Sequence, residues 1–274
     1  MEKILFVTDA MAINEQALDF ATFLCNLTHS KLTGVFLENM EYEGRASSKL
    51  KEIAGAPTHM AVHDIKTKCC EENIQLFKTA CESRGISSII HRDRGIPLYE
   101  IVKESKYADL LLIDAELSFE NQQESIPTKL VQHLLMEAAC PVIITPVGFE
   151  GIEQIIFAYD GHPSAILAIK QFTHLFPQFS QQPVNIITVN NEHTVTAEEK
   201  HQLKEWLREH YNQVDFTERK GIVKTELLEY VLNKKNAFLV MGAYGRSTIS
   251  NMLKSSHATP ILRMTNQPVF ICHS

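Results

Sequence analysis

The sequence predicts an α/β protein made of two copies of one doubly wound domain, and two observations lead to this prediction. The first is a long internal repeat, in which three short apolar segments of the first half return in the second. The paired segments are 3–9 with 154–160, 108–114 with 236–242, and 141–145 with 268–272. The second is that short apolar runs alternate with longer amphipathic ones, which is typical of βα units on a parallel sheet. A repeat of roughly 140 residues indicates a duplicated domain, because solenoid repeats are far shorter.

The first half contains five expected strands and four expected helices. The strands are 3–8, 31–37, 87–92, 109–114 and 141–145, and the helices are 14–28, 61–84, 96–105 and 127–138. The first, fourth and fifth strands are almost wholly apolar, as expected where helices cover both faces of a parallel sheet. We therefore expect a five-stranded sheet with strand order 3-2-1-4-5 and helices on both faces.

The second half repeats this pattern over a slightly shorter length. Its expected strands are 154–159, 184–189, 214–219, 237–241 and 268–272, and its expected helices are 163–176, 196–211, 222–234 and 256–265. Gly148 and Gly151 form a short linker, which gives domain limits of 1–147 and 152–274. About 140 residues is a common domain size and suffices to bury a core.

Composition excludes several classes of protein. The formal net charge is −7 with 12 histidines, so no basic stripe would attract a nucleic acid backbone. No apolar stretch approaches the roughly 20 residues that span a bilayer, and Met1–Lys3 leads directly into a strand. We therefore expect a cytoplasmic protein that binds neither nucleic acid nor membrane. The six cysteines show no framework spacing, so we expect no disulfides.

The last strand of each half predicts how the halves associate. Both runs are apolar and would lie at the edge of a 3-2-1-4-5 sheet, where an exposed apolar edge invites pairing. We expect Val142–Thr145 to pair antiparallel with Val269–Cys272, which joins the two domains within one chain. A homodimer and a protein partner of unknown kind remain open.

The segment Val240-Met241-Gly242-Ala243-Tyr244-Gly245-Arg246-Ser247, together with the first strands ending in Asp9 and Asp160, resembles the universal stress protein family. The duplication resembles its tandem, two-domain, UspA-like members. This resemblance implies two Rossmann-like domains of the adenine nucleotide alpha hydrolase-like kind. It also implies ATP or ADP as the possible ligand.

Family members that bind ATP carry Gly-x2-Gly-x9-Gly-(Ser/Thr) after the fourth strand. This chain supplies Gly242 and Gly245, followed by Ser255-Ser256 in place of the third glycine and its hydroxyl partner. Glycines there let the backbone approach phosphate oxygens, at the crevice where strand order reverses. The expected cofactor-binding residues are Ala158, Asp160, Val189, Gly242, Gly245, Arg246, Ser255 and Ser256. Ser255 adds a Cβ that disfavours a positive φ, which weakens or abolishes binding.

The first half departs further from the pattern. Asp114 and Leu117 stand where the second half has Gly242 and Gly245, and Glu116 lies beside them. Carboxylates at the expected phosphate position repel a polyanion, so we expect no nucleotide in the first half. That copy instead serves as a pairing partner for the second.

Three other features carry weaker hypotheses. His59 and His63 lie one helical turn apart, but no third ligand follows at convincing spacing, so we expect no metal site. The stretch 38–58 has no counterpart in the second half and is either functional or simply tolerated. No Walker lysine and no positioned base accompany the motif, so we expect no catalytic residues and no enzyme, with slow ATP hydrolysis as a third interpretation.

Two function classes therefore remain. The first is a stress-response protein that binds ATP or ADP weakly in its second domain. The alternative is an interaction or regulatory module of the same fold that binds no nucleotide. Gly242→Asp, which copies the charge of the first half, is expected to abolish binding while the fold survives with modest loss of stability.

Overall fold

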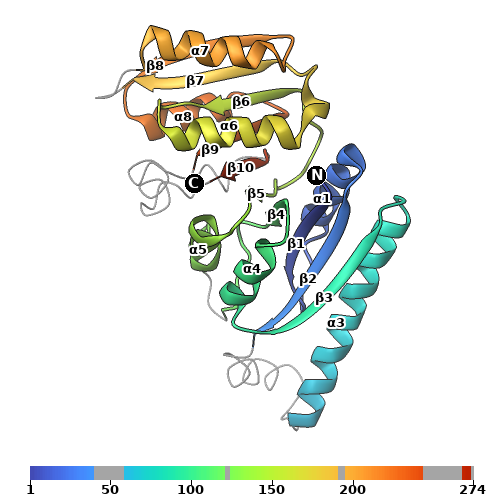
Figure 1. Cartoon of the computed structure of the whole chain (residues 1–274). Helices are drawn as coiled ribbons and strands as arrows, with labels where there is room; N and C mark the ends of the chain where they lie inside the picture. The colour runs from blue at the N-terminus through green and yellow to red at the C-terminus, as the bar shows by residue number, and fades with distance from the viewer. Residues whose placement is uncertain (40–58, 121–123, 191–194, 243–266, 273–274) are drawn as a thin grey trace. The chain divides into compact units, whose positions relative to one another are not determined.

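The structure is a computed structural model, and it describes residues 1–39, 59–120, 124–190, 195–242 and 267–272. By its internal contacts the chain divides into two compact units, Met1–Cys140 and Pro141–Ser274. Figure 1 shows the elements of both units.

The first unit contains a parallel sheet with strand order β3-β2-β1-β4. Its elements in chain order are β1 (Lys3–Asp9), α1 (Glu15–Thr28), β2 (Lys31–Asn39), α3 (His59–Glu82), β3 (Ser88–Gly95), α4 (Pro97–Ser105), β4 (Leu110–Ile113) and α5 (Lys129–Glu137). Helix α1 packs against α3, and α4 packs against α5. Asn14 starts α1 because its side chain accepts hydrogen bonds from the amides of Gln16 and Ala17, at 3.0 and 3.2 Å.

The second unit contains the strand order β8-β7-β6-β9-β10, which is the expected 3-2-1-4-5 order. Its elements are β5 (Val142–Ile144), β6 (Gln154–Ala158), α6 (Pro163–Leu175), the 3-10 helix η1 (Pro177–Phe179), β7 (Val184–Asn190), α7 (Ala197–Arg208), β8 (Val214–Lys220), α8 (Val223–Leu232), β9 (Ala237–Gly242) and β10 (Val269–Cys272). Thr196 and Glu199 form a capping box at the start of α7, which fixes where that helix begins.

Strand β5 belongs by its contacts to the second unit, although it follows the elements of the first. It pairs antiparallel with β10, in the register Val142 to Ile271, Ile143 to Phe270 and Ile144 to Val269. This confirms the expected antiparallel pairing of these two segments. The contact boundary at Cys140 and Pro141 lies before β5, so it differs from the domain limits of 1–147 and 152–274, which remain a prediction.

The cores are rich in phenylalanine. In the first unit the ring of Phe77 from α3 lies 6.3 Å from Phe6 and 5.6 Å from Phe36. In the second unit the fully buried ring of Phe172 on α6 meets Phe238 of β9 at 4.9 Å and Phe270 of β10 at 5.4 Å. These rings attach each helix to the sheet beneath it, because aromatic pairs gain energy beyond the area they bury.

The element boundaries agree with the sequence to within a few residues. The expected helix at 256–265 and most of the stretch 38–58 lie outside the described residues. The short helix η1, which follows α6, was missed, because a single turn leaves no periodic signal in the sequence.

No disulfide joins the six cysteines, all of which lie in the described part of the chain. Burial raises the pKa of Cys25 to about 12 and that of Cys272 to about 11. Because the thiolate is the reactive form, iodoacetamide at pH 8 should modify the partly exposed Cys69 first and leave Cys25 and Cys272 intact in the folded protein. Peptide mass spectrometry after timed alkylation measures this order. Early modification of Cys25 would contradict the packing described here.

Candidate functional site

The described part of the candidate site lies at the carboxyl ends of three adjacent strands in the second unit. Ala158 ends β6 and pairs with Ile187 of β7, and Val189 lies two residues further along β7. Paired residues and residues two apart share one face of a sheet, so Ala158 and Val189 face the same side. Both side chains are half-buried, which leaves part of each accessible to a ligand.

Asp160 follows the end of β6 in a tight turn. Its Oδ1 accepts a hydrogen bond from the amide of His162 at 3.0 Å, and Gly161 between them has a φ of +83°. Helix α6 begins one residue later, at Pro163, without a side-chain cap from His162. One oxygen of Asp160 is therefore used by the turn, while the exposed carboxylate keeps lone pairs for hydroxyl or amine donors.

Gly242 ends β9, directly beside the first turn of α6. A Cβ on Gly242 would lie 2.6 Å from the Ala165 nitrogen and 2.6 Å from the Ser164 carbonyl carbon. These are backbone atoms, so a side chain here forces α6 away from β9. The expectation that Gly242→Asp leaves the fold intact is therefore wrong, because the residue is a close-packing position as well as a motif glycine.

A segment that the sequence analysis did not single out packs beside this turn. The Val195 Cγ2 atom would lie 3.7 Å from a Cβ on Gly161. The Glu199 carboxylate accepts hydrogen bonds from the Thr196 amide and hydroxyl, both at 2.8 Å, which hold its pKa below the usual value. Burial, followed by the charges of Glu199 and Asp160, raises the pKa of Tyr159. The capping-box spacing Thr196-x-x-Glu199 was the signal available in the sequence.

The remaining predicted residues, Gly245, Arg246, Ser255 and Ser256, lie outside the described residues. The structure thus brings together Ala158, Asp160, Val189 and Gly242 at one end of the sheet. Their role as contacts to a nucleotide stays a prediction.

The corresponding place in the first unit is a pocket of about 160 Å³ at the carboxyl ends of β1 and β4. Its polar lining includes Asp9, Asn14, Asp114, Glu116 and Ser118. Leu117 lines it as well, so the residues that replace the motif glycines of the second unit do face this crevice.

Hydrogen bonds within this pocket occupy several of its polar groups. Asp9 Oδ1 accepts from the Met11 amide at 2.9 Å, and Asp114 Oδ1 accepts from the Glu116 amide at 2.9 Å. The side chain of Asn14 donates to Asp114, which ties the start of α1 to the end of β4. Burial raises the pKa of Asp9, against the opposing effects of the Met11 amide and Lys66. The pocket is therefore both acidic and internally bonded.

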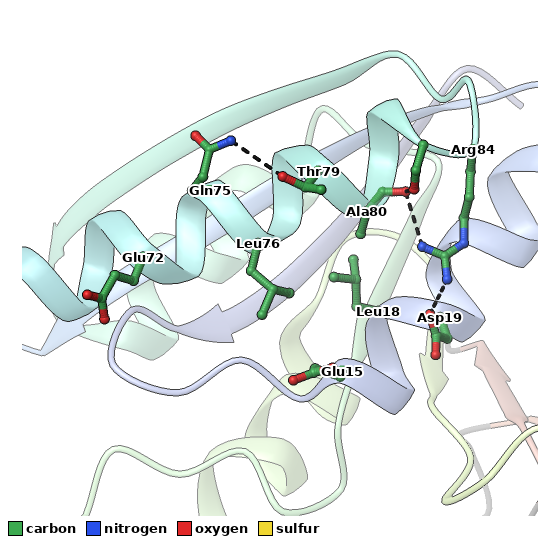
Figure 2. A pocket seen from close by; sticks show the side chains of 10 residues that line it. Glu15, Leu18, Asp19, Glu72, Gln75, Leu76, Thr79, Ala80 and Arg84 are labelled. Atoms are coloured by element: carbon green, nitrogen blue, oxygen red, sulfur yellow. Dashed lines mark hydrogen bonds and ion pairs between the residues drawn. The ribbon is translucent and has the colours of Figure 1, made fainter.

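A larger groove, of about 640 Å³, runs between α1 and α3 (Figure 2). Leu18 of α1 and Leu76 of α3 line it, and Arg84, which follows the end of α3, forms an ion pair with Asp19 of α1 at 2.5 Å. Among the described residues its lining contains no histidine or cysteine, and the one arginine there is paired. We assign it no chemistry. His59 and His63 lie within the bounds of α3, but their side chains fall outside the described residues.

Comparison with known proteins agrees with this geometry. Residues 172–273 match the model of the universal stress protein family. Over these residues the chain is similar to the universal stress protein family. A curated relative, universal stress protein Slr1230 of Synechocystis sp., is 25% identical over 141 residues, which is 51% of this chain and 49% of the relative. The chain thus aligns with about half the length of that relative.

Solved structures show that the fold extends over the whole chain. A universal stress protein from Archaeoglobus fulgidus has a TM-score of 0.70 at 17% identity and covers 99% of this chain and 98% of its own. One from Pseudomonas aeruginosa, described as a putative universal stress protein, has a TM-score of 0.61 at 15% identity, with coverage of 100% and 93%. At these identities the likeness concerns the fold. Among the described residues no helix is long and apolar enough to cross a membrane.

Proposed function

We propose that this chain is a cytoplasmic stress-response protein that binds ATP or ADP in its second unit and no nucleotide in its first. The observation that carries the proposal is the asymmetry between the two equivalent crevices. In the second unit β9 ends in Gly242, whereas in the first unit the corresponding Asp114 lines a pocket with Asp9 and Glu116. A polyphosphate is repelled from the acidic pocket, whereas Gly242 adds no charge at the equivalent strand end of the second unit.

Size supports the same assignment. The first-unit pocket holds about 160 Å³, whereas sites for nucleotide-sized ligands are typically about 300–1,000 Å³. In the second unit, Ala158 and Val189 offer a half-buried apolar face for a base, and the exposed Asp160 carboxylate offers an acceptor for ribose hydroxyls. Asp160 and Glu199 are both acidic, so magnesium is expected to assist the binding of a triphosphate.

The proposed role is ligand-dependent regulation rather than catalysis. In this role the first unit acts as a structural partner of the second, and nucleotide binding changes how the protein meets a further protein or a second copy of itself. Size-exclusion chromatography with light scattering, with and without nucleotide, measures whether nucleotide changes the association of the protein with a second copy of itself. If the protein binds no nucleotide, the remaining interpretation is an interaction or regulatory module of the same fold.

Asp160→Asn should weaken ATP binding by about 10-fold or more, since a hydrogen bond to a charged group contributes roughly 1.5–3 kcal/mol. The asparagine oxygen still accepts from the His162 amide, so the turn is retained. The matched control is Asp9→Asn at the equivalent position of the first unit, which should leave affinity unchanged. Isothermal titration calorimetry with ATP and ADP, with and without magnesium, gives both results. Equal loss in the two variants, or no binding by the natural protein, would contradict the proposal.

A further inference from the structure

An aromatic cluster at the ends of α6 and α7 carries an inference independent of the nucleotide proposal. His174 lies in the last turn of α6, Trp206 in the last turn of α7, and His210 just after α7. The two imidazole rings have centroids 6.0 Å apart and are tilted by 44°. The Trp206 ring lies 4.4 Å from His210 and 6.1 Å from His174.

We propose that His174 and His210 form a two-imidazole site for a divalent transition-metal ion, next to Trp206. A metal–nitrogen bond of about 2.0–2.1 Å places the ion roughly 3.2 Å from a ring centre, so tetrahedral coordination puts the centres of two bound rings roughly 5 Å apart. The observed separation is 6.0 Å, and a small rotation of the exposed His174 side chain brings the two rings to that spacing. Neutral imidazole is a favoured ligand of zinc, copper and nickel, and copper(II) is bound most tightly in this series.

The backbone beneath the two histidines is held by a buried hydrogen bond. Tyr211, next to His210, donates through its hydroxyl to the Thr173 hydroxyl at 3.1 Å, and Thr173 is next to His174. Thr173 in turn donates to the Ile169 carbonyl at 2.8 Å. Thr173 and Tyr211 are both buried, which fixes the spacing of their neighbours. A site whose ligand-bearing backbone is held in place before binding loses less entropy when the ion arrives.

The ring nitrogens of the two histidines are available. Neither imidazole has a hydrogen bond or ion pair with another described residue, and His174 is exposed while His210 is half-exposed. No group of three or more His, Cys, Asp or Glu in the described ranges could hold a metal ion, so water would complete the coordination. The site is therefore open and should bind and release the ion reversibly.

Trp206 makes the proposal directly measurable, because it is the one tryptophan of the sequence. Copper(II) chloride added to the whole protein should quench its fluorescence saturably, and a chelator should restore it. His174→Ala and His210→Ala should each weaken copper binding by at least roughly 10-fold, since even outer-shell partners of metal ligands contribute about 10–100-fold. His201→Ala, on the exposed side of α7, is the control and should bind as the natural protein does.

A second measurement separates specific binding from contact quenching. Zinc(II) does not quench tryptophan, so zinc that occupies the same site should restore the fluorescence of the copper-loaded protein. Circular dichroism of each variant checks that the fold is retained, and an unfolded variant is replaced by His174→Gln or His210→Gln. Quenching that does not saturate, or equal copper affinity in the natural protein and both histidine variants, would overturn the proposal.

Discussion

Gly242→Ala should destabilise the second unit by about 3 kcal/mol or more, because overpacking that displaces backbone costs more than a side-chain adjustment. The added Cβ would lie 2.6–2.7 Å from three backbone atoms of Ser164 and Ala165. No side-chain rotation relieves such contacts, so either β9 or the first turn of α6 must move. Urea unfolding followed by Trp206 fluorescence measures the loss, since Trp206 lies in the same unit.

Gly161→Ala is the matched control in the same region. Gly161 has a φ of +83°, and the nearest atom to an added Cβ is Val195 Cγ2 at 3.7 Å. The Gly161→Ala change should therefore lower the free energy of unfolding by about 1–2 kcal/mol, because only the left-handed backbone conformation is strained. Gly242 is not among the glycines with positive φ, so its cost is steric. If the two alanine variants lose the same stability, α6 does not approach β9 as closely as described.

Phe172→Ala should lower the free energy of unfolding by about 3–5 kcal/mol, which is the usual range when a fully buried phenylalanine is replaced by alanine. The Phe172 ring is the centre of the aromatic core of the second unit, and its centroid lies 4.9–6.1 Å from those of five other rings. These belong to Phe157, Phe176, Phe179, Phe238 and Phe270. Its removal loosens α6 from both β9 and β10.

Ile166→Ala on the same helix is the control for this prediction. Ile166 is 37% exposed and should lose about 1 kcal/mol or less, because surface positions contribute little. Denaturant midpoints of the two variants and the natural protein decide the comparison. A cost for Phe172→Ala near that of Ile166→Ala would mean that the surrounding rings close the cavity.

Strands β6 and β9 could be predicted because they are short apolar runs at repeated spacing, and both appear where that pattern places them. The antiparallel pairing of β5 with β10 also followed from the sequence, because two apolar edges need cover. That β5 belongs to the second unit could not be predicted from the sequence. Gly148 and Gly151 mark a turn in the sequence, but the limit of a compact unit depends on which strand covers β10.

The candidate site could be predicted only in part. Sequence spacing placed Asp160 and Gly242 at neighbouring strand ends, because the carboxyl ends of parallel strands meet at one edge of a sheet. The contact of Gly242 with α6 depends on the distance between Gly242 and Ala165, which are 77 positions apart in the chain (242 − 165), and no local pattern encodes it. The same holds for His174 and His210, which the fold brings together from two helices that are separate in sequence.

The position of β10 between β9 and β5 determines where the second unit can be separated from the chain. A shortened protein that begins at residue 152 would lack β5, so the amides and carbonyls along Val269–Ile271 would lose their partner strand. An apolar edge of that kind recruits strands from other molecules, which leads to self-association and poor solubility. A protein that begins at residue 141 keeps β5 beside β10, so the edge at Val269–Ile271 stays paired.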